Sequence, residues 1–196
     1  ICGDNLIVGG EVCDGTNVSG LDCTDFGYDG GVLVCNSQCN GYDFEQCISA
    51  PIVIEICTRA DLENVRLNLN GDYIQVCDID LMGEEWMPIG SQATQFMGTF
   101  DGNGFTIYNL NINQPMADYV GLFRFTKDAI LEDIELVNMN VTGRQNVGGL
   151  VGQSNATSIT GSIVSGTVNG NNAVGGLIGN AQNSNIIGSG TSGNFL

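Results

Sequence analysis

The chain has 196 residues, of which 29 are glycine and only 14% are charged, so its composition is not that of an ordinary helical globule. Its 22 acidic and 5 basic side chains give a formal net charge of -17, and such a surface repels phosphate backbones and anionic lipid headgroups. Binding to nucleic acid or to a membrane surface is therefore not expected, and the lack of histidine removes His-based triads and His metal ligands.

Cysteines are concentrated at the beginning of the chain. Six of the eight lie within the first 47 residues: Cys2, Cys13, Cys23, Cys35, Cys39 and Cys47. An even number of cysteines in a segment too small for a good core is typical of a disulfide scaffold in an oxidising compartment. Only Cys35-x3-Cys39 approaches the spacing of a zinc site. Residues 1–48 are therefore expected to form a disulfide-rich module of an extracellular protein, secreted or at the cell surface.

The disulfide pairing in this module stays open at the level of sequence. Residues 27–31, Gly-Tyr-Asp-Gly-Gly, predict a hairpin turn, because Asp-Gly and Gly-Gly tolerate positive φ angles. A bridge between Cys23 and Cys35 would join its two strands. Sequential pairing would add Cys2 to Cys13 and Cys39 to Cys47, but six cysteines allow many other connectivities.

The motifs around these cysteines carry a resemblance. Residues 10–15, Gly-Glu-Val-Cys-Asp-Gly, and residues 27–39 are similar to the short cysteine-rich repeats of secreted myxobacterial and related bacterial surface proteins. The resemblance covers about residues 2–47 and implies an extracellular bacterial module. The chain opens at Ile1 without Met, as expected of a mature chain after signal removal or of an excised fragment.

Acidic residues crowd the same module, which has no basic side chain. Because Ca2+ favours oxygen ligands from such loops, calcium is a candidate ligand. The candidate ligand residues are Asp4, Glu11, Asp14 and Asp29. The alternative is an acidic loop that is merely solvated.

A linker at residues 49–52 leads into the second part of the chain. There Thr58 and Asp61 predict a capping box and a helix over about residues 59–69, which Gly71 ends. Residues 73–81 alternate like one half-buried strand. Cys57 and Cys77 are then expected to form a disulfide between the helix entry and this strand.

The remainder of the chain repeats. Residues 147–152, Val-Gly-Gly-Leu-Val-Gly, recur at residues 174–179 as Val-Gly-Gly-Leu-Ile-Gly, an offset of 27, and residues 119–123 align with the first of these at 28. Self-similarity at such a period predicts a solenoid of stacked repeats. Short β-branched runs separated by Gly and Asn make each repeat a coil of strands and turns.

These repeats carry a second resemblance, over about residues 54–196. The double glycine motif, with residues 96–110 before it, is similar to the GLUG repeat of bacterial surface and secreted proteins, including some large IgA-cleaving metallopeptidases. The resemblance implies an all-β fold, a right-handed parallel β-helix with an N-terminal capping helix, over residues 53–196. The chain departs from the pattern where Arg124 stands in place of a usual glycine.

Few residues suggest catalysis. Asp78 and Asp80 lie two apart on the predicted strand and would project from one face, as a carboxylate pair for glycoside chemistry might. The alternative is that they solvate the outer face, and Asp101 is interpreted as a turn former. A zinc peptidase needs His-Glu-x-x-His, which this chain lacks. We therefore expect no enzymatic activity, although a polysaccharide-cleaving enzyme remains a third hypothesis for the carboxylate pair.

Two further features concern glycans. Asn17, Asn140 and Asn155 begin N-x-Ser/Thr triplets and are candidate glycosylation sites if the source glycosylates. Trp86 could stack on a sugar, but it is expected to cover the core beside the cap.

Charge is missing from the end of the chain. Residues 145–196 contain no charged side chain, and the last repeat ends in the apolar Phe195 and Leu196. An uncharged, uncapped β-helix end is a template for another chain's strands. We therefore expect a structural function, a self-assembling, head-to-tail homopolymer in a bacterial surface filament or layer, with Phe195 and Leu196 in the contact and the N-terminal module as its partner surface.

The alternative function is an adhesin or carbohydrate-binding module of a larger surface protein, with surface glycans as its partners. No cofactor is expected apart from the calcium considered above. No apolar run reaches about 18 residues, so no membrane insertion is expected either.

Overall fold

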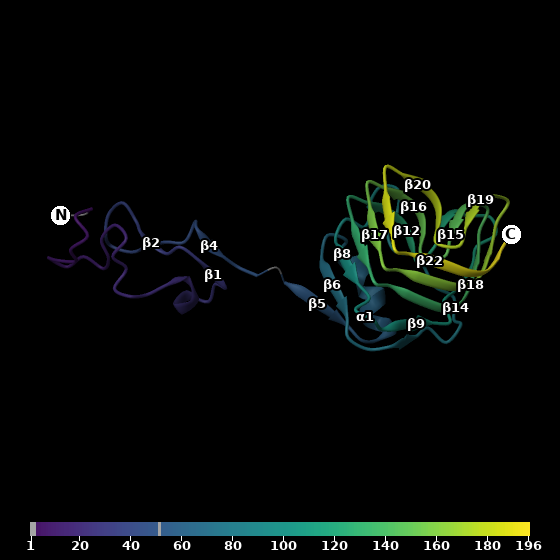
Figure 1. Ribbon diagram of the computed structural model, residues 1–196, viewed down its shortest axis with the longest axis horizontal. Helices are drawn as coiled ribbons and strands as arrows, with labels where there is room; N and C mark the ends of the chain where they lie inside the picture. Colours follow the sequence, from purple (N-terminus) through teal and green to yellow (C-terminus); the bar gives the residue numbers. More distant parts are fainter. Residues whose placement is uncertain (1–2, 51) are drawn as a thin grey trace. The chain divides into compact units, whose positions relative to one another are not determined.

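The computed structural model describes residues 3–50 and 52–196. The chain divides into two compact units, Ile1–Pro51 and Ile52–Leu196 (Figure 1). The division falls within the linker expected at residues 49–52.

The first unit contains little regular structure. A 3-10 helix η1 covers Cys23–Phe26, strand β1 (Gly30–Gly31) pairs with β4 (Cys47–Ile48), and β2 (Val34–Cys35) pairs with β3 (Tyr42–Asp43), both antiparallel. The hairpin predicted at residues 27–31 is wrong, because Gly27 instead caps η1 in the left-handed conformation. The tight turn lies between β2 and β3, where the Asn36 amide donates to the Gly41 carbonyl at 2.9 Å.

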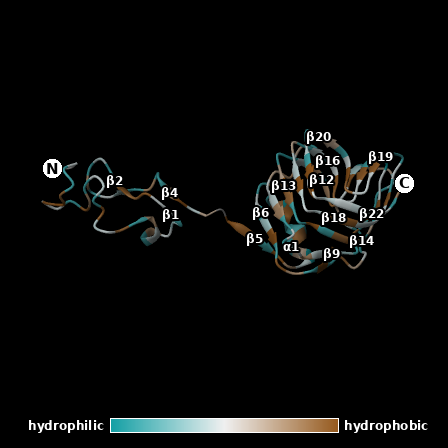
Figure 2. Cartoon of the chain, in the orientation of Figure 1, coloured by the Kyte–Doolittle hydropathy of each residue, from teal (hydrophilic) through white to brown (hydrophobic). Residues whose placement is uncertain are grey.

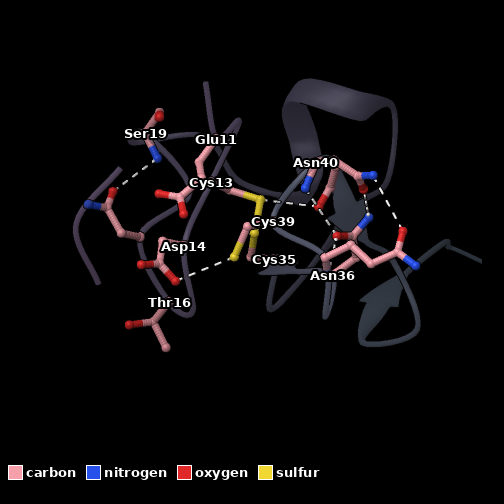
Figure 3. The surroundings of a disulfide bond; sticks show 12 residues. Glu11, Cys13, Asp14, Thr16, Ser19, Cys35, Asn36, Cys39 and Asn40 are labelled. Atoms are coloured by element: carbon pink, nitrogen blue, oxygen red, sulfur yellow. Dashed lines mark hydrogen bonds between the residues drawn. A yellow bond between two sulfur atoms is a disulfide. The ribbon is translucent and has the colours of Figure 1, made fainter. Parts of the chain in front are cut away.

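Disulfides join segments that are distant in this unit's sequence. Cys13 bonds to Cys35 (Figure 3), and Cys23 bonds to Cys47. The sequential pairing is therefore wrong for every pair that it proposed. The reason is that β1 pairs with β4, past the β2–β3 hairpin, so the partner of Cys23 is Cys47. Cys39 is also disulfide-bonded, whereas Cys2 lies outside the described residues.

The second unit begins with a short cap. Strand β5 (Val53–Ile56) leads into helix α1 (Arg59–Asn64) and the 3-10 turn η2 (Val65–Leu67). The expected capping box is present, since the Asp61 amide donates to Thr58 Oγ1 at 3.2 Å and the Thr58 amide donates to Asp61 Oδ2 at 2.9 Å. The helix is shorter than the predicted 59–69, because the chain tightens into η2 after Asn64 and leaves the helix at Asn68.

The disulfide expected between Cys57 and Cys77 is present. The strand predicted over residues 73–81 is broken, however, into β6 (Asp72–Gln75) and β7 (Ile79–Asp80). The two pieces belong to different six-stranded sheets, because the coil turns a corner at residues 76–78. Asp78 therefore lies at the corner and not on the same strand as Asp80.

The rest of the unit is a parallel β-helix, in which equivalent strands of successive coils stack on one another (Figure 1). Its strands are β8 (Thr99–Asp101), β9 (Thr106–Tyr108), β10 (Asn111–Asn113), β11 (Asp118–Val120), β12 (Phe123–Lys127), β13 (Ile130–Glu132), β14 (Glu135–Thr142), β15 (Gln145–Gly148), β16 (Val151–Asn155), β17 (Ser158–Thr160), β18 (Ile163–Asn169), β19 (Asn172–Gly175), β20 (Ile178–Gln182), β21 (Asn185–Ile187) and β22 (Gly190–Phe195).

Two six-stranded sheets and two three-stranded sheets form the walls of the solenoid. The six-stranded sheets run β21-β17-β13-β8-β6-β5 and β22-β18-β14-β9-β7, with β10 also pairing with β14. We call the first of these the cap-to-tail sheet, because it begins at β5 beside the capping helix and ends at β21 in the last coil. The three-stranded sheets are β11-β15-β19 and β12-β16-β20.

The strand register reproduces the sequence repeat. Val147 pairs with Val174, and Ile159 pairs with Ile186, as the offset of 27 predicts. In the preceding coil, Phe123 pairs with Val151 at the predicted 28, but Val120 pairs with Val147 at 27. The predicted alignment is therefore one residue out at Val120, because two residues separate Val120 from Phe123 whereas three separate Val147 from Val151.

Apolar side chains stack in columns inside the coils. One column runs through the cap-to-tail sheet from Ile54 through Tyr73, Phe100, Leu131 and Ile159 to Ile186. Its four middle members are buried. Apolar and polar segments alternate along the strands of the solenoid (Figure 2), as inward and outward side chains of a strand require.

The repeated glycines permit close approach of neighbouring coils. A Cβ atom on Gly152 would lie 2.4 Å from the Tyr119 carbonyl carbon, and one on Gly148 would lie 2.6 Å from the Gly179 amide nitrogen of the next coil. At the position of Gly152 in the preceding coil stands Arg124, whose Nη2 donates to Gln114 Oε1 at 2.7 Å. The departure from the repeat is thus accommodated by an outward side chain.

Candidate functional site

The two predicted catalytic carboxylates each bind the next coil. Asp78 Oδ1 accepts the Thr106 amide at 2.9 Å, whereas Asp80 Oδ1 accepts the Met82 amide at 2.7 Å and Asn109 Nδ2 at 2.8 Å. The hydrogen bond from Asn109, with that from the Met82 amide, holds the pKa of Asp80 below its ordinary value. Both side chains therefore connect coils, and Asp101 likewise accepts the Asn103 amide at 2.7 Å within its turn.

The candidate calcium ligands are not gathered into a site. Among the described residues, no group of three or more His, Cys, Asp or Glu could hold a metal ion. Glu11 Oε2 accepts the Val8 amide at 3.0 Å, and Asp29 Oδ2 accepts the Ala50 amide at 2.5 Å. Asp4 Oδ1 accepts the Leu6 amide at 3.0 Å, so Asp4 and Glu11 each fix their own loop, whereas Asp29 binds a segment distant in the sequence.

Asp14 is the buried member of the set. Its carboxylate accepts the backbone amides of Gly3, Asp4 and Leu6. Burial raises the pKa of Asp14, but these hydrogen bonds outweigh it and hold the pKa below its ordinary value. The charged carboxylate thus organises the N-terminal loop beside the Cys13–Cys35 disulfide (Figure 3).

The three sequons lie in different settings. Asn17 is exposed, and its Nδ2 donates to the Asn5 carbonyl at 3.1 Å. Asn140 is exposed in β14. Asn155 is half-buried, and the hydroxyl of its Thr157 is buried and donates to the Asn155 carbonyl at 3.2 Å.

Trp86 lies in the core, as expected. Its side chain is fully buried, and Nε1 donates to the Leu122 carbonyl at 3.3 Å. The guanidinium of Arg66 lies over the indole ring, 4.4 Å from its centroid. Trp86 therefore has no face free to stack on a sugar.

A groove of about 640 Å³ lies where the six-stranded sheet of β7, β9, β10, β14, β18 and β22 bends. We call it the asparagine groove. Its lining residues are Asp80, Met82, Gly83, Asn109, Leu110, Asn111, Asn138, Met139, Asn140, Gly166 and Thr167. The bend arises in β14, where Asn138 has a φ of 59° and the register with β18 shifts between Leu136 and Met139.

Two ladders of amide side chains run along this groove from coil to coil. In the first, Asn138 Nδ2 donates to Asn109 Oδ1 at 2.6 Å, and Asn109 Nδ2 donates to Asp80 Oδ1 at 2.8 Å. In the second, Asn140 Nδ2 donates to Asn111 Oδ1 at 3.2 Å. The groove therefore presents the same pair of amide side chains in two successive coils.

The sequence analysis did not identify this groove, although a signal was present. Asn109-Leu-Asn111 recurs as Asn138-Met-Asn140 at an offset of 29. Such an Asn-x-Asn repeat within a solenoid predicts two parallel columns of amides on one face. What it does not predict is the bend that makes the face concave.

The two ends of the cap-to-tail sheet form the other candidate surface. Neither β5 nor β21 pairs with another described strand on its outer side. Each ends the same apolar column with an exposed isoleucine, since Ile54 is 37% and Ile186 is 45% exposed. Each end thus combines free backbone hydrogen-bonding groups with apolar surface, the features that allow strand addition.

Phe195 and Leu196, the residues expected in the assembly contact, lie in the last coil after β21. Phe195 is half-buried against the core, and Leu196 is 74% exposed. The backbone of Leu196 is already paired, because its amide donates to the Val168 carbonyl and its carbonyl accepts the Gly170 amide. Of the two, Leu196 offers the more accessible side chain.

Comparison with known proteins gives two relatives. The chain is 38% identical over 119 residues to Halomucin of Haloquadratum walsbyi, covering 53% of this chain and 1% of that protein. It is 40% identical over 101 residues to a putative Gly-rich membrane protein of Evansella cellulosilytica, covering 47% of this chain and 11% of that protein. The chain thus spans only a small part of the length of the relatives it matches.

No family model matches the chain, so its resemblance to the GLUG and cysteine-rich repeats stays a prediction. No solved structure matches it either. Within the residues that the structure describes, none of the helices has the length and apolar character needed to cross a bilayer.

Proposed function

We propose that the chain is a structural module of an extracellular protein at the bacterial cell surface, and that its β-helix joins copies end to end into a filament or layer. The observation that carries the proposal is the pair of open edges, β5 and β21, at opposite ends of the cap-to-tail sheet. The disulfides support an oxidising location. Relatives named Halomucin and a Gly-rich membrane protein support a place at the cell surface.

The proposed contact continues the fold across the junction. Strand β21 of one copy would pair in parallel with β5 of the next, as β17 pairs with β21 inside the coil stack. Ile186 would then lie against Ile54 of the neighbour, and the apolar column would run on without a gap. A contact between unlike ends of a molecule does not close on itself in general, so it produces an open polymer.

Charge also favours this contact. Residues 145–196 carry no charged side chain, whereas the cap contains three acidic residues and the basic Arg59 and Arg66. The meeting of an uncharged end with this charged end involves no like-charge repulsion. We propose β5, and not the N-terminal module as a whole, as the partner of the last coil, because β5 offers a free strand edge that can pair with β21.

Each residue in the proposed contact contributes little to the free energy of association, so many residues at the end of the coil must contribute together. Completing the burial of two partly exposed isoleucines contributes on the order of 1 kcal/mol each. Each new backbone hydrogen bond adds about 0.5–1.5 kcal/mol. Since association costs several kcal/mol, strand pairing and apolar contact are both needed, and one charge in the column is expected to abolish assembly.

The test uses the 196-residue chain itself, because in a longer polypeptide a following coil could occupy the edge of β21. Sedimentation velocity and negative-stain microscopy of the unmodified chain should show polymers. Ile54→Asp and Ile186→Asp should each be monomeric and folded. Ile163→Asp is the matched control, since Ile163 is 52% exposed on β18, away from both open edges, and this variant should still assemble.

A monomeric unmodified chain at high concentration, with calcium supplied, would contradict end-to-end assembly. The alternative function, an adhesin or carbohydrate-binding module of a larger surface protein, would then be preferred. The asparagine groove favours that alternative.

A further inference from the structure

We propose that the asparagine groove is a binding site for a neutral glycan chain that lies along the axis of the solenoid. The inference deepens the adhesin alternative and does not depend on the end-to-end contact. The groove is lined by side chains from the walls of several coils, and neither Ile54 nor Ile186 lines it.

The first support is unused hydrogen-bonding capacity. Each asparagine amide has two N–H donors and a carbonyl oxygen with two lone pairs. In the first ladder Asn109 uses one donor toward Asp80 and one acceptor position toward Asn138. The remaining donor and lone pair are free to bind a hydroxyl group, which is itself both donor and acceptor.

The second support is preorganisation. The ladder bonds hold each amide in one orientation, and the backbone behind them is paired, since the Asn109 amide donates to the Val137 carbonyl and the Asn140 amide to the Leu110 carbonyl. Side chains that are already ordered lose little conformational entropy when a ligand binds. Asn138 and Asn140 are nevertheless exposed, so the ladder is accessible from solvent.

The third support is spacing. Successive coils of stacked parallel strands are about 4.8 Å apart, which is close to the advance of one sugar residue in an extended glycan. The same pair of amides recurs in two successive coils, at Asn109 and Asn111 and at Asn138 and Asn140. In the next coil Thr167 stands opposite Asn140 and offers a hydroxyl in place of the amide, while Gly166 stands opposite Met139 and adds no side chain.

Charge and apolar contact narrow the ligand class. Asp80, at one end of the first ladder, has a depressed pKa and is charged at neutral pH, so an anionic polysaccharide is disfavoured there as it is by the net charge of -17. A single carboxylate among amides is also a poor divalent-cation site. Met82, which is 76% exposed at the rim, offers apolar surface to the C–H face of a sugar ring.

The experiment is a titration of the chain, produced in a host without N-glycosylation because Asn140 begins a sequon. The probes are chitopentaose and cellopentaose as neutral β-linked chains and pentagalacturonate as the anionic comparison. Binding is followed by calorimetry and by the asparagine side-chain amide signals in NMR spectra. Unmodified protein should bind at least one neutral probe with a Kd of about 1 mM or tighter.

Two sets of variants locate the site. The double variant Asn138→Ala, Asn140→Ala should bind at least about tenfold more weakly, the effect of losing a few hydrogen bonds. Met82→Asp should also weaken binding while leaving both ladders intact, which covers the case in which the double variant unfolds. Asn172→Ala, on exposed β19, is the matched control and should bind as the unmodified chain does.

The inference is overturned if neither neutral probe binds at about 10 mM, if Met82→Asp and a folded double variant bind as tightly as the unmodified chain, or if pentagalacturonate binds most tightly. Any of these results would leave the ladders with a purely structural function. The monomeric Ile186→Asp chain should bind the probes unchanged, so loss of assembly and loss of glycan binding are separate outcomes.

Discussion

Substitution of Gly152 tests whether the repeated glycines exist because neighbouring coils approach closely. A Cβ atom at this position would lie 2.4 Å from the carbonyl carbon of Tyr119 and 2.7 Å from the Val120 amide nitrogen. Both are backbone atoms of the preceding coil, held in place because Val120 pairs with Val147. In Gly152→Ala the two coils must therefore separate locally.

The magnitude follows from overpacking. Inserting a methyl group into a packed interior costs roughly 1–3 kcal/mol, and separation of coils also lengthens hydrogen bonds worth about 0.5–1.5 kcal/mol each. Replacing glycine by alanine restricts the unfolded chain and returns only about 0.4–1 kcal/mol. The free energy of unfolding should therefore fall by about 1–3 kcal/mol.

Gly190→Ala is the matched control, because a Cβ atom there has no neighbouring atom within 4 Å. It should leave the free energy of unfolding unchanged or raise it by up to about 1 kcal/mol. Both variants are measured by guanidinium denaturation with the disulfides intact. If Gly152→Ala lies within about 0.5 kcal/mol of the unmodified chain, close coil contact does not explain the repeated glycine at this position.

Three further predictions concern the cap, its disulfide and the carboxylate pair. The double variant Cys57→Ser, Cys77→Ser should lose roughly 3 kcal/mol of stability in denaturation, because the bridge joins residues 20 apart in the sequence and so restricts the unfolded chain. An unchanged denaturation midpoint would contradict this. The hydrogen bond from the Thr58 hydroxyl, with backbone bonds from Cys57 and Thr58, depresses the pKa of Asp61. The ionised Asp61 carboxylate therefore stabilises the folded state at pH values above its ordinary pKa of about 4. This stabilisation is lost as the pH falls through the depressed pKa of the folded state. Melting temperatures should show a smaller acid-induced decrease for Asp61→Ala than for the unmodified chain, and equal decreases would refute it. Neither the unmodified chain nor Asp80→Asn should release reducing sugar from polygalacturonate, and release by the unmodified chain alone would overturn the expectation that the chain is not an enzyme.

Much of the solenoid could be predicted because its structural repeat is also a repeat of the amino-acid sequence. The offset of 27 between the two double glycine motifs equals the register that pairs Val147 with Val174. Local signals were equally direct at the cap, where Thr58 and Asp61 form the capping box. What failed were the features that depend on where the chain turns, such as the corner after Gln75 that separates Asp78 from the strand of Asp80.

The N-terminal module was less predictable for a related reason. Its short strands have too few residues to show a period, and β1 pairs with β4 across an intervening hairpin. The pairing of Cys23 with Cys47 follows from that topology and not from proximity in sequence. The asparagine groove was missed because its concavity depends on the positive φ of Asn138, and the sequence shows only the repeated Asn-x-Asn.

The most direct test of end-to-end assembly is to mix the two blocked variants. Ile54→Asp keeps an intact β21 end, and Ile186→Asp keeps an intact β5 end, so one copy of each can form a single junction. Sedimentation velocity should show monomers for each variant alone and heterodimers, without larger polymers, for the mixture. Monomers in the mixture, or polymers in either variant alone, would contradict a contact between β21 of one copy and β5 of the next.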